Sequence, residues 1–354
     1  MPTFLFKGGR VWDGEKFENK NVYVADGKIA YMGCGEPEAD YSYDITGKIL
    51  SAGFVDIHTH MKHISSDRFG FEPHLFTVPF GVTAAADCGG NMGSDELVDS
   101  LTIKAVVFAS TKFADNKVNY EILEERLSRY DKHLAGIKIG FDKTVYDVRD
   151  EKPLKELAEY ARAKGLRLIV HCSGSPVSMK QYLPVLNPGD ILTHAFHGGI
   201  NTCADDNFES IREAQKRGVI IDAGMAGCIH TDFKIFEDAI KNNIIPDVIS
   251  TDITRISAYI RGGIYGLTMC MSVAMDLGMK EEAVFRCVTS NAAKSVGKER
   301  EWGCLREGGC ADLTVVDYDG AGYDMTDKSG NRAYNNKSLR CVLTMINGDI
   351  QYRV

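Results

Sequence analysis

The chain has 354 residues, 44% of them hydrophobic, so it can bury a large core and is long for one domain. Its formal net charge of −8 comes without a basic block, which argues against nucleic acid or an anionic membrane as a partner and favours a small-molecule substrate. The ten cysteines include no Cys-x-x-Cys pair, and the N-terminus lacks the apolar core of a signal peptide. We therefore expect a cytoplasmic enzyme with free thiols; whether it forms a homo-oligomer stays open.

The first fifty residues predict a set of short strands. Strand-like runs at 21–24 and 28–31 lie on either side of an Asp26–Gly27 turn.

From residue 53 the pattern changes to apolar runs that alternate with amphipathic stretches. Eight strands are predicted at 54–60, 81–89, 103–110, 136–140, 166–172, 190–196, 219–224 and 248–252. Amphipathic helices are predicted at 120–134, 151–164, 207–217 and 232–242. Eight strands interleaved with helices favour parallel pairing, and eight is the number that closes a (β/α)8 TIM barrel.

After the eighth predicted strand the chain first becomes helical and then returns to strands. Residues 261–297 are predicted to be largely helical, and strands resume at 311–317 and 341–348. The polar stretch 320–337 between these strands is predicted to be a surface loop.

Two terminal β segments that flank a barrel most simply form one discontinuous domain. The predicted architecture is therefore α/β, with a small β-sandwich made of residues 1–52 and 304–354 and a catalytic barrel of residues 53–303.

Six polar residues fall at the ends of predicted strands, and in a parallel barrel those ends meet at one rim. They are His58, His60, Lys138, His171, His194 and Asp252. Residues i and i+2 of a strand share a face, so His58 and His60 can form a chelating pair for a cation such as zinc. The alternative is two hydrogen-bonded core histidines.

Lys138 stands between Ile137 and Ile139 on a central strand, where an inward-pointing ammonium ion is costly. A neutral lysine amine can react with carbon dioxide to give a carbamate, whose oxygens can bridge two metal ions. The alternatives are an ion pair between Lys138 and an inward-pointing acid, or a short strand whose end is already exposed to water.

The remaining three residues can complete a two-metal site. His171 and His194 each close an apolar strand and can hold a second ion. Asp252 can bind the first ion and accept a proton from bound water, although an Asp at this position can also cap a helix.

Together these residues resemble the metal ligands of the amidohydrolase superfamily, in the subtype with two metals and a carboxylated lysine. The pattern is His-x-His after strand one, Lys after strand four, His after strands five and six, and Asp after strand eight. The resemblance covers essentially the whole chain and implies a TIM barrel with a sandwich built from both termini. Residues 192–198 and 249–253 are most similar to the deacetylase-like or dihydroorotase-like branch, which is associated with N-acyl amino acids and acylated hydroxy acids.

The resemblance implies hydrolysis of an amide or ester bond in a small acylated substrate. A hydroxide that bridges two divalent ions is the nucleophile, and Asp252 passes its proton to the leaving group. Zinc is the default metal for these donors, and manganese or iron fits them too. The alternatives are a cyclic-amide hydrolase of the dihydroorotase or hydantoinase type, or a deaminase, on the same barrel. A non-enzymatic assembly protein would be expected to have lost ligands.

The chain departs from this branch at two positions. Met225 stands where relatives carry a His after the Gly of strand seven, and Lys62 replaces the Arg of the dihydroorotase His-x-His-x-Arg motif. The predicted substrate-binding residues are His197, Arg255, Lys62 and Asn91, and His63 and His230 also lie just beyond strand ends. Three cysteines near the rim, Cys88, Cys172 and Cys228, are predicted to be core or supporting residues.

Overall fold

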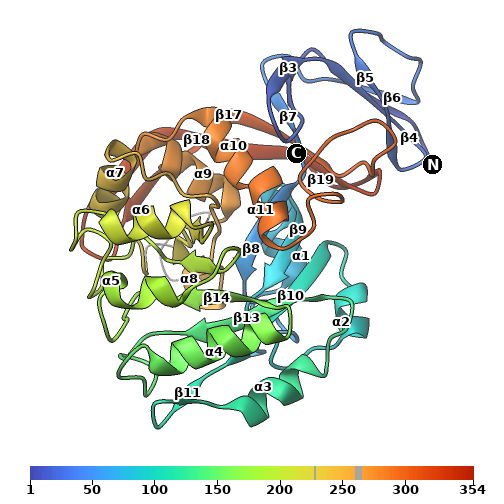
Figure 1. Cartoon of the computed structure of the whole chain (residues 1–354). Helices are drawn as coiled ribbons and strands as arrows, with labels where there is room; N and C mark the ends of the chain where they lie inside the picture. The colour runs from blue at the N-terminus through green and yellow to red at the C-terminus, as the bar shows by residue number, and fades with distance from the viewer. Residues whose placement is uncertain (227–228, 260–264) are drawn as a thin grey trace.

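The computed structural model describes residues 1–226, 229–259 and 265–354 (Figure 1). A seven-stranded parallel sheet has the order β16-β15-β14-β13-β10-β9-β8. Its strands are β8 (Phe54–Thr59), β9 (Val82–Asp87), β10 (Lys104–Thr111), β13 (Leu134–Gly140), β14 (Arg167–His171), β15 (Ile191–Thr193) and β16 (Ile220–Asp222). Seven of the eight predicted barrel strands are thereby confirmed.

The predicted eighth strand at 248–252 is an extended segment that bridges its neighbours only at its two ends. Val248 pairs with Asp222 and Ile253 pairs with Thr59, both in parallel, so the segment closes the barrel between β16 and β8. Between these bridges the Thr251 backbone N–H donates to the Asp56 carboxylate instead of a strand carbonyl, at 3.2 Å. The fold is therefore a closed barrel. Its eighth segment is held in place by the Asp56 side chain as well as by backbone pairing.

The predicted helices lie outside the barrel, as Figure 1 shows. They are α3 (Tyr120–Leu127), α4 (Lys152–Ala163), α6 (Glu209–Lys216) and α7 (Phe233–Lys241). In α4 the buried residues Leu154, Leu157, Ala158 and Ala161 follow the spacing of one helical face. Helix α3 ends seven residues earlier than predicted, because the chain must turn before Leu134 begins β13.

Shorter elements fill the connections. They are α1 (Pro73–Phe76), η1 (Val78–Phe80), α2 (Asp95–Asp99), β11 (Phe113–Ala114), β12 (Lys117–Val118), α5 (Met179–Tyr182) and η2 (Leu183–Val185). The region predicted as helical after the eighth strand contains α9 (Leu267–Asp276), α10 (Glu281–Cys287) and α11 (Ser290–Ser295), preceded by α8 (Arg255–Tyr259). Its first residues, 261–264, lie outside the described residues. Within the described chain, no helix combines the length and apolar character that a membrane span requires.

Two further sheets lie outside the barrel, one built from the N-terminal segment and the other from both ends of the chain. The four-stranded sheet contains β1 (Phe4–Lys7), β4 (Asn21–Ala25), β5 (Lys28–Gly33) and β6 (Tyr41–Asp44). The six-stranded sheet contains β2 (Arg10–Trp12), β3 (Phe17–Asn19), β7 (Ile49–Ala52), β17 (Leu313–Thr326), β18 (Arg332–Ile346) and β19 (Asp349–Arg353). Because β7 pairs with β17 and Phe6, Leu50 and Leu313 share one apolar cluster, the two ends of the chain form a single sandwich. The domain limits at residues 52 and 304 stay a prediction.

The prediction of a surface loop at 320–337 is wrong. Most of these residues belong to the long antiparallel hairpin β17–β18, which runs along the barrel towards α7 (Figure 1). The stretch has few apolar residues, but Tyr323 and Ala333 are buried on the face that meets the barrel. The hairpin tip reaches the start of α7, where the Asp327 side chain accepts a hydrogen bond from the Phe233 backbone N–H at 2.6 Å.

Candidate metal centre

The ends of β8, β13 and the eighth barrel segment bring four predicted ligands into one group. Lys138 Nζ lies 2.8 Å from His58 Nε2. Asp252 Oδ1 lies 3.2 Å from His58 Nε2 and 3.1 Å from His60 Nε2. These residues lie far apart in the sequence. They meet because the parallel strands of the barrel all end at one rim.

The hydrogen bonds of Thr193 fix the orientation of His58. The Thr193 hydroxyl donates its only hydrogen to Asp222 Oδ2 at 2.7 Å, and it therefore accepts from His58 Nδ1 at 2.9 Å. The proton of His58 then sits on Nδ1, and the lone pair of Nε2 faces Lys138 and Asp252. A ring nitrogen presented in this way is the usual form of a histidine metal ligand.

Hydrogen bonds also orient the rings of His194 and His171. His194 Nδ1 donates to the Gly224 carbonyl at 2.5 Å, and its buried Nε2 has no hydrogen-bond partner among the described residues. That Nε2 lies 3.7 Å from Asp252 Oδ2. His171 Nε2 contacts Ser173 Oγ at 2.8 Å and Asp142 Oδ2 at 3.3 Å, which leaves Nδ1 as its candidate ligand atom. A buried, unpartnered nitrogen lone pair beside a carboxylate fits a bound cation.

The backbone at two of these residues adopts an unfavourable conformation. His194 has φ 62° and Asp252 has φ 47°, in the left-handed region that side-chain-bearing residues usually avoid. Such a conformation costs about 1–3 kcal/mol and persists where the surroundings enforce it. At Asp252 that support includes the preceding Thr251, whose hydroxyl donates to Asp56 Oδ2 at 2.6 Å.

Burial sets the protonation states of the group. Burial and the nearby cationic groups hold the pKa of His58 and of His194 well below their usual range, and burial also lowers the pKa of His171. Burial acts to raise the pKa of Asp252, but His58 and His60 outweigh it and hold that pKa below its usual range. Neutral histidines and an ionised carboxylate are the forms that bind metal ions.

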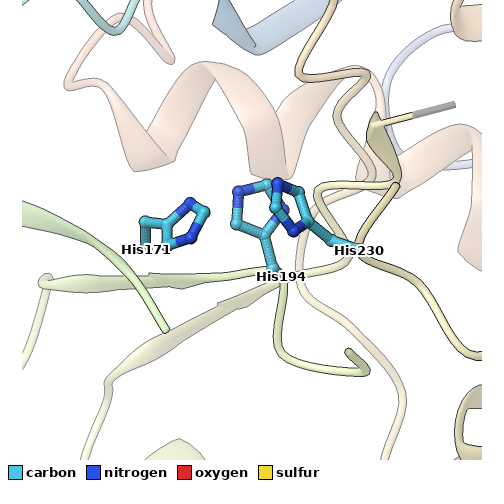
Figure 2. A group of neighbouring side chains, drawn as sticks. All are labelled: His171, His194 and His230. Carbon is cyan, nitrogen blue, oxygen red and sulfur yellow. The ribbon is translucent and has the colours of Figure 1, made fainter. Parts of the chain in front are cut away.

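A fifth histidine, His230, joins the group from the loop after β16. Figure 2 shows the His230 ring against that of His194, with His171 on the far side of His194 in this view. The centroid of the His230 ring lies 4.2 Å from that of His194 and 4.8 Å from that of His171. The candidate ligand atoms of the three histidines lie within 4.8 Å of one another. His230 is held by its backbone, because its carbonyl accepts from the Gly198 N–H at 2.9 Å. It follows Met225 by five residues, so an imidazole reaches this rim although the expected His is missing from strand seven.

A cavity of about 520 Å³ opens beside the group. Its walls include His58, His60, Lys138, His171, His230 and Asp252 from the group, and Phe69, Asn91, Ser110, Arg126, Val145 and Tyr146 around it. The cavity gives a small molecule direct access to the candidate ligands.

Of the four predicted substrate-binding residues, Asn91 lines the cavity and the other three are absent from its described walls. The Lys62 side chain is 41% exposed and lies 3.9 Å from Glu72. Arg255 is exposed at the start of α8. His197 is fully buried, and burial lowers its pKa to about 3. For these three the substrate-binding role stays a prediction that the geometry does not favour.

The remaining residues named from the sequence do not add reactive groups. His63 is exposed and pairs with Asp67 at 2.8 Å. Cys88 and Cys172 are buried, and burial raises the pKa of both thiols. Cys228 lies outside the described residues, and the nine cysteines that are described are all free thiols.

Comparison with known proteins places the chain in a family. The model of the amidohydrolase family matches residues 49–350. The chain is 27% identical to a deacetylase of Enterococcus faecalis over 98% of both chains. It is 26% identical to a deacetylase of Agrobacterium fabrum, over 86% of this chain and 80% of that one.

Solved structures show the same fold. A dihydroorotase superposes with a TM-score of 0.85 at 22% identity, over 99% of this chain and 97% of that one. An adenine deaminase gives 0.84 at 23% identity, over 99% of both chains. With the family match covering most of the sequence, the chain belongs to the amidohydrolase family, whose members hydrolyse carbon–nitrogen bonds.

Proposed function

We propose that this enzyme is a metal-dependent deacylase that hydrolyses the amide bond of a small N-acylated substrate such as an N-acyl amino acid. The observation that carries the proposal is the convergence of oriented imidazole nitrogens and the Asp252 carboxylate at the wall of an open cavity. Two relatives that align with most of this chain are deacetylases, which supports the acyl group as the part removed.

The donor set supports two divalent ions, and zinc is the metal we expect for these nitrogen and carboxylate donors. In this arrangement His58, His60 and Asp252 would hold one ion, and His171 and His194 would hold the other. Lys138, once carboxylated by carbon dioxide, would supply oxygen ligands to both. When bound, the ions polarise the acyl carbonyl and activate the attacking water.

Asp252 serves as the proton carrier. Its Oδ1 is the atom nearest His58 and His60, while its Oδ2 faces His194 and His230 at 3.7 Å and 3.8 Å. One oxygen can therefore hold a metal while the other takes a proton from water and gives it to the departing amine. Because the pKa of Asp252 is held below its usual range, the carboxylate is in the form that accepts a proton.

Other residues keep the ligands in place and line the approach. Asp142 and Ser173 fix the ring of His171. Phe69, Val145 and Tyr146 give the cavity an apolar wall, which can hold an acyl group or an apolar side chain and keep bulk water away.

The direct test is a substrate screen with metal-free protein reconstituted with zinc, manganese or iron. The screen measures acetate release from N-acetyl D- and L-amino acids and O-acetyl hydroxy acids, ring opening of cyclic ureides, and ammonia release from aminated purines. We expect acetate release from N-acetyl amino acids that depends on added metal. Turnover confined to the cyclic ureides or to ammonia release would contradict the deacylase proposal.

A further inference from the structure

A guanidinium group stands in the wall of the cavity without an acidic partner. Arg126, on α3, donates from one terminal nitrogen, Nη1, to the backbone carbonyl and to the hydroxyl of Ser110, both at 2.8 Å. Its Nε and second terminal nitrogen, Nη2, have no hydrogen-bond partner within the described part of the chain, and Arg126 makes no ion pair there. An arginine has five N–H donors in a planar fork, so most of its binding capacity is uncommitted.

The neighbouring Arg129, in the turn just after α3, pairs with an acid in the ordinary way. Its partner is Glu125 on α3, whose side chain is 53% exposed. Arg126 gives up part of its hydration at the cavity wall instead, and burial lowers its pKa accordingly. A partly buried cation without a protein anion is costly unless a ligand supplies the opposite charge.

Ser110 and Asn91 extend this group of donors. The Ser110 hydroxyl donates its only hydrogen to Asn91 Oδ1 at 2.5 Å, which is why it accepts from Arg126. The Asn91 side-chain amide lines the same cavity, and its Nδ2 donors have no partner among the described residues. Lys112 also lines this cavity and adds a second positive charge without an ion pair in the described chain.

The position of the group relative to the metal centre follows from strand pairing. In the β10–β13 ladder, Ser110 lies in register with Lys138, the proposed bridge between the ions. Neighbouring strands are about 4.8 Å apart. The backbones of Ser110 and Lys138 are therefore about one strand spacing apart, and Ser110, Lys138 and Arg126 all line the same cavity, so a small substrate can place its anion beside Ser110 and its scissile bond beside Lys138.

We propose that Arg126, supported by Ser110 and Asn91, binds the α-carboxylate of an N-acyl amino acid whose acyl group lies at the metal centre. This inference rests on the proposed deacylase function and specifies its substrate class as anionic. An arginine can donate to both oxygens of a carboxylate at once. The pair therefore recognises the orientation of the carboxylate as well as its charge.

The test compares an acid with its uncharged analogue. With zinc-loaded protein, kcat and KM are measured for N-acetylalanine and N-acetylalaninamide, both enantiomers of each. We expect the native enzyme to prefer the acid. We expect Arg126→Met to lower kcat/KM for the acid by roughly 10- to 100-fold, mainly through KM, and to change the amide by no more than a few-fold.

Two further variants separate charge from geometry and from a general disturbance of α3. Arg126→Lys should recover only part of the preference, because an ammonium group lacks the fork. Arg129→Gln removes a partly exposed arginine that follows α3 and pairs with Glu125 on that helix, and it should leave both substrates at native rates. An unchanged preference for the acid in Arg126→Met would overturn the inference.

A binding measurement tests the role of Arg126 even if the proposed deacylase function is wrong. If the native enzyme releases no acetate from any N-acetyl substrate, the deacylase proposal fails. Calorimetric binding of N-acetylalanine and N-acetylalaninamide to the zinc-loaded native protein and Arg126→Met still tests the subsite. We expect tighter binding of the acid to the native protein and loss of that difference in the variant, whereas equal binding of the acid to both proteins would refute the role of Arg126.

Discussion

Asp252 combines an unfavourable backbone conformation with two carboxylate oxygens that face different side chains. Its left-handed backbone and its two differently placed oxygens are fixed by neighbours on β8 and on its own segment. A carboxylate in this position can both ligate and move a proton, and the two roles are separable by substitution.

Asp252→Asn should lower kcat by about 10²- to 10⁴-fold, because the amide keeps a ligating oxygen but cannot accept the proton of the attacking water. Most of the metal should remain bound. The measurements are kcat and metal content, with Asp319→Asn on the exposed sandwich surface as a control. A rate within a few-fold of native would make Asp252 a structural ligand only.

Lys138→Ala should reduce both metal occupancy and activity, because it removes the proposed carbamate bridge beside His58. Short-chain carboxylic acids added to the variant should restore part of the activity by placing oxygens in the vacated space. Metal analysis and rate measurements with and without acetate or propionate check this. Native occupancy and rate in the variant would show that the ions need no bridge at residue 138.

Individual residues of the candidate site differ in how far the sequence could predict them. His58, Lys138 and Asp252 were predictable because each follows an apolar run, and strand ends converge in a barrel. The sequence pattern indicates no role for His230, because its path to the rim depends on the loop after strand seven. Arg126 lies inside an amphipathic helix, and only the docking of α3 determines that it faces the cavity.

At the scale of elements, the hairpin β17–β18 is the feature that the sequence pattern concealed. Its polar residues reflect an element with one face to solvent and the other on the barrel. Its tip meets the loop that carries His230, since the Lys328 backbone N–H donates to the Thr231 carbonyl at 3.2 Å. The hairpin thereby reaches the loop at the rim of the candidate metal centre.

Asp327→Ala should lower the free energy of unfolding by about 1–3 kcal/mol, because its carboxylate accepts from the backbone N–H groups of Phe233, Ser329 and Asn331. Denaturant unfolding measures the loss. Asp324→Ala is the matched control on the same hairpin: it removes an exposed pair with Arg332, which is worth about 0–1 kcal/mol. Equal effects of the two substitutions would show that the tip contact is not special.

At the scale of the whole molecule, the terminal sheets and the barrel share a buried contact. Trp12 on β2 is fully buried, donates to Thr289 Oγ1 at 2.9 Å and packs against Phe285 of α10. The fold class was predictable from strand count and terminal β segments, but this contact was not, because it joins residues 277 positions apart.

Trp12→Ala should destabilise the protein by about 3–5 kcal/mol, since it leaves a cavity between the two parts and removes the hydrogen bond that the Thr289 hydroxyl accepts, although that hydroxyl still donates to the Phe285 carbonyl. Trp12→Phe should cost less, because most of the apolar volume stays. Denaturant unfolding of both variants checks the prediction, and a loss below about 1 kcal/mol for Trp12→Ala would mean that the sheets contribute little to barrel stability.

The most direct test of the account is a titration of metal-free protein with zinc while acetate release from an N-acetyl amino acid is followed. We expect no activity without metal and a rise that saturates at two ions per chain. Saturation at a single ion would contradict the two-metal centre, and undiminished acetate release from the metal-free protein would contradict metal-dependent hydrolysis itself.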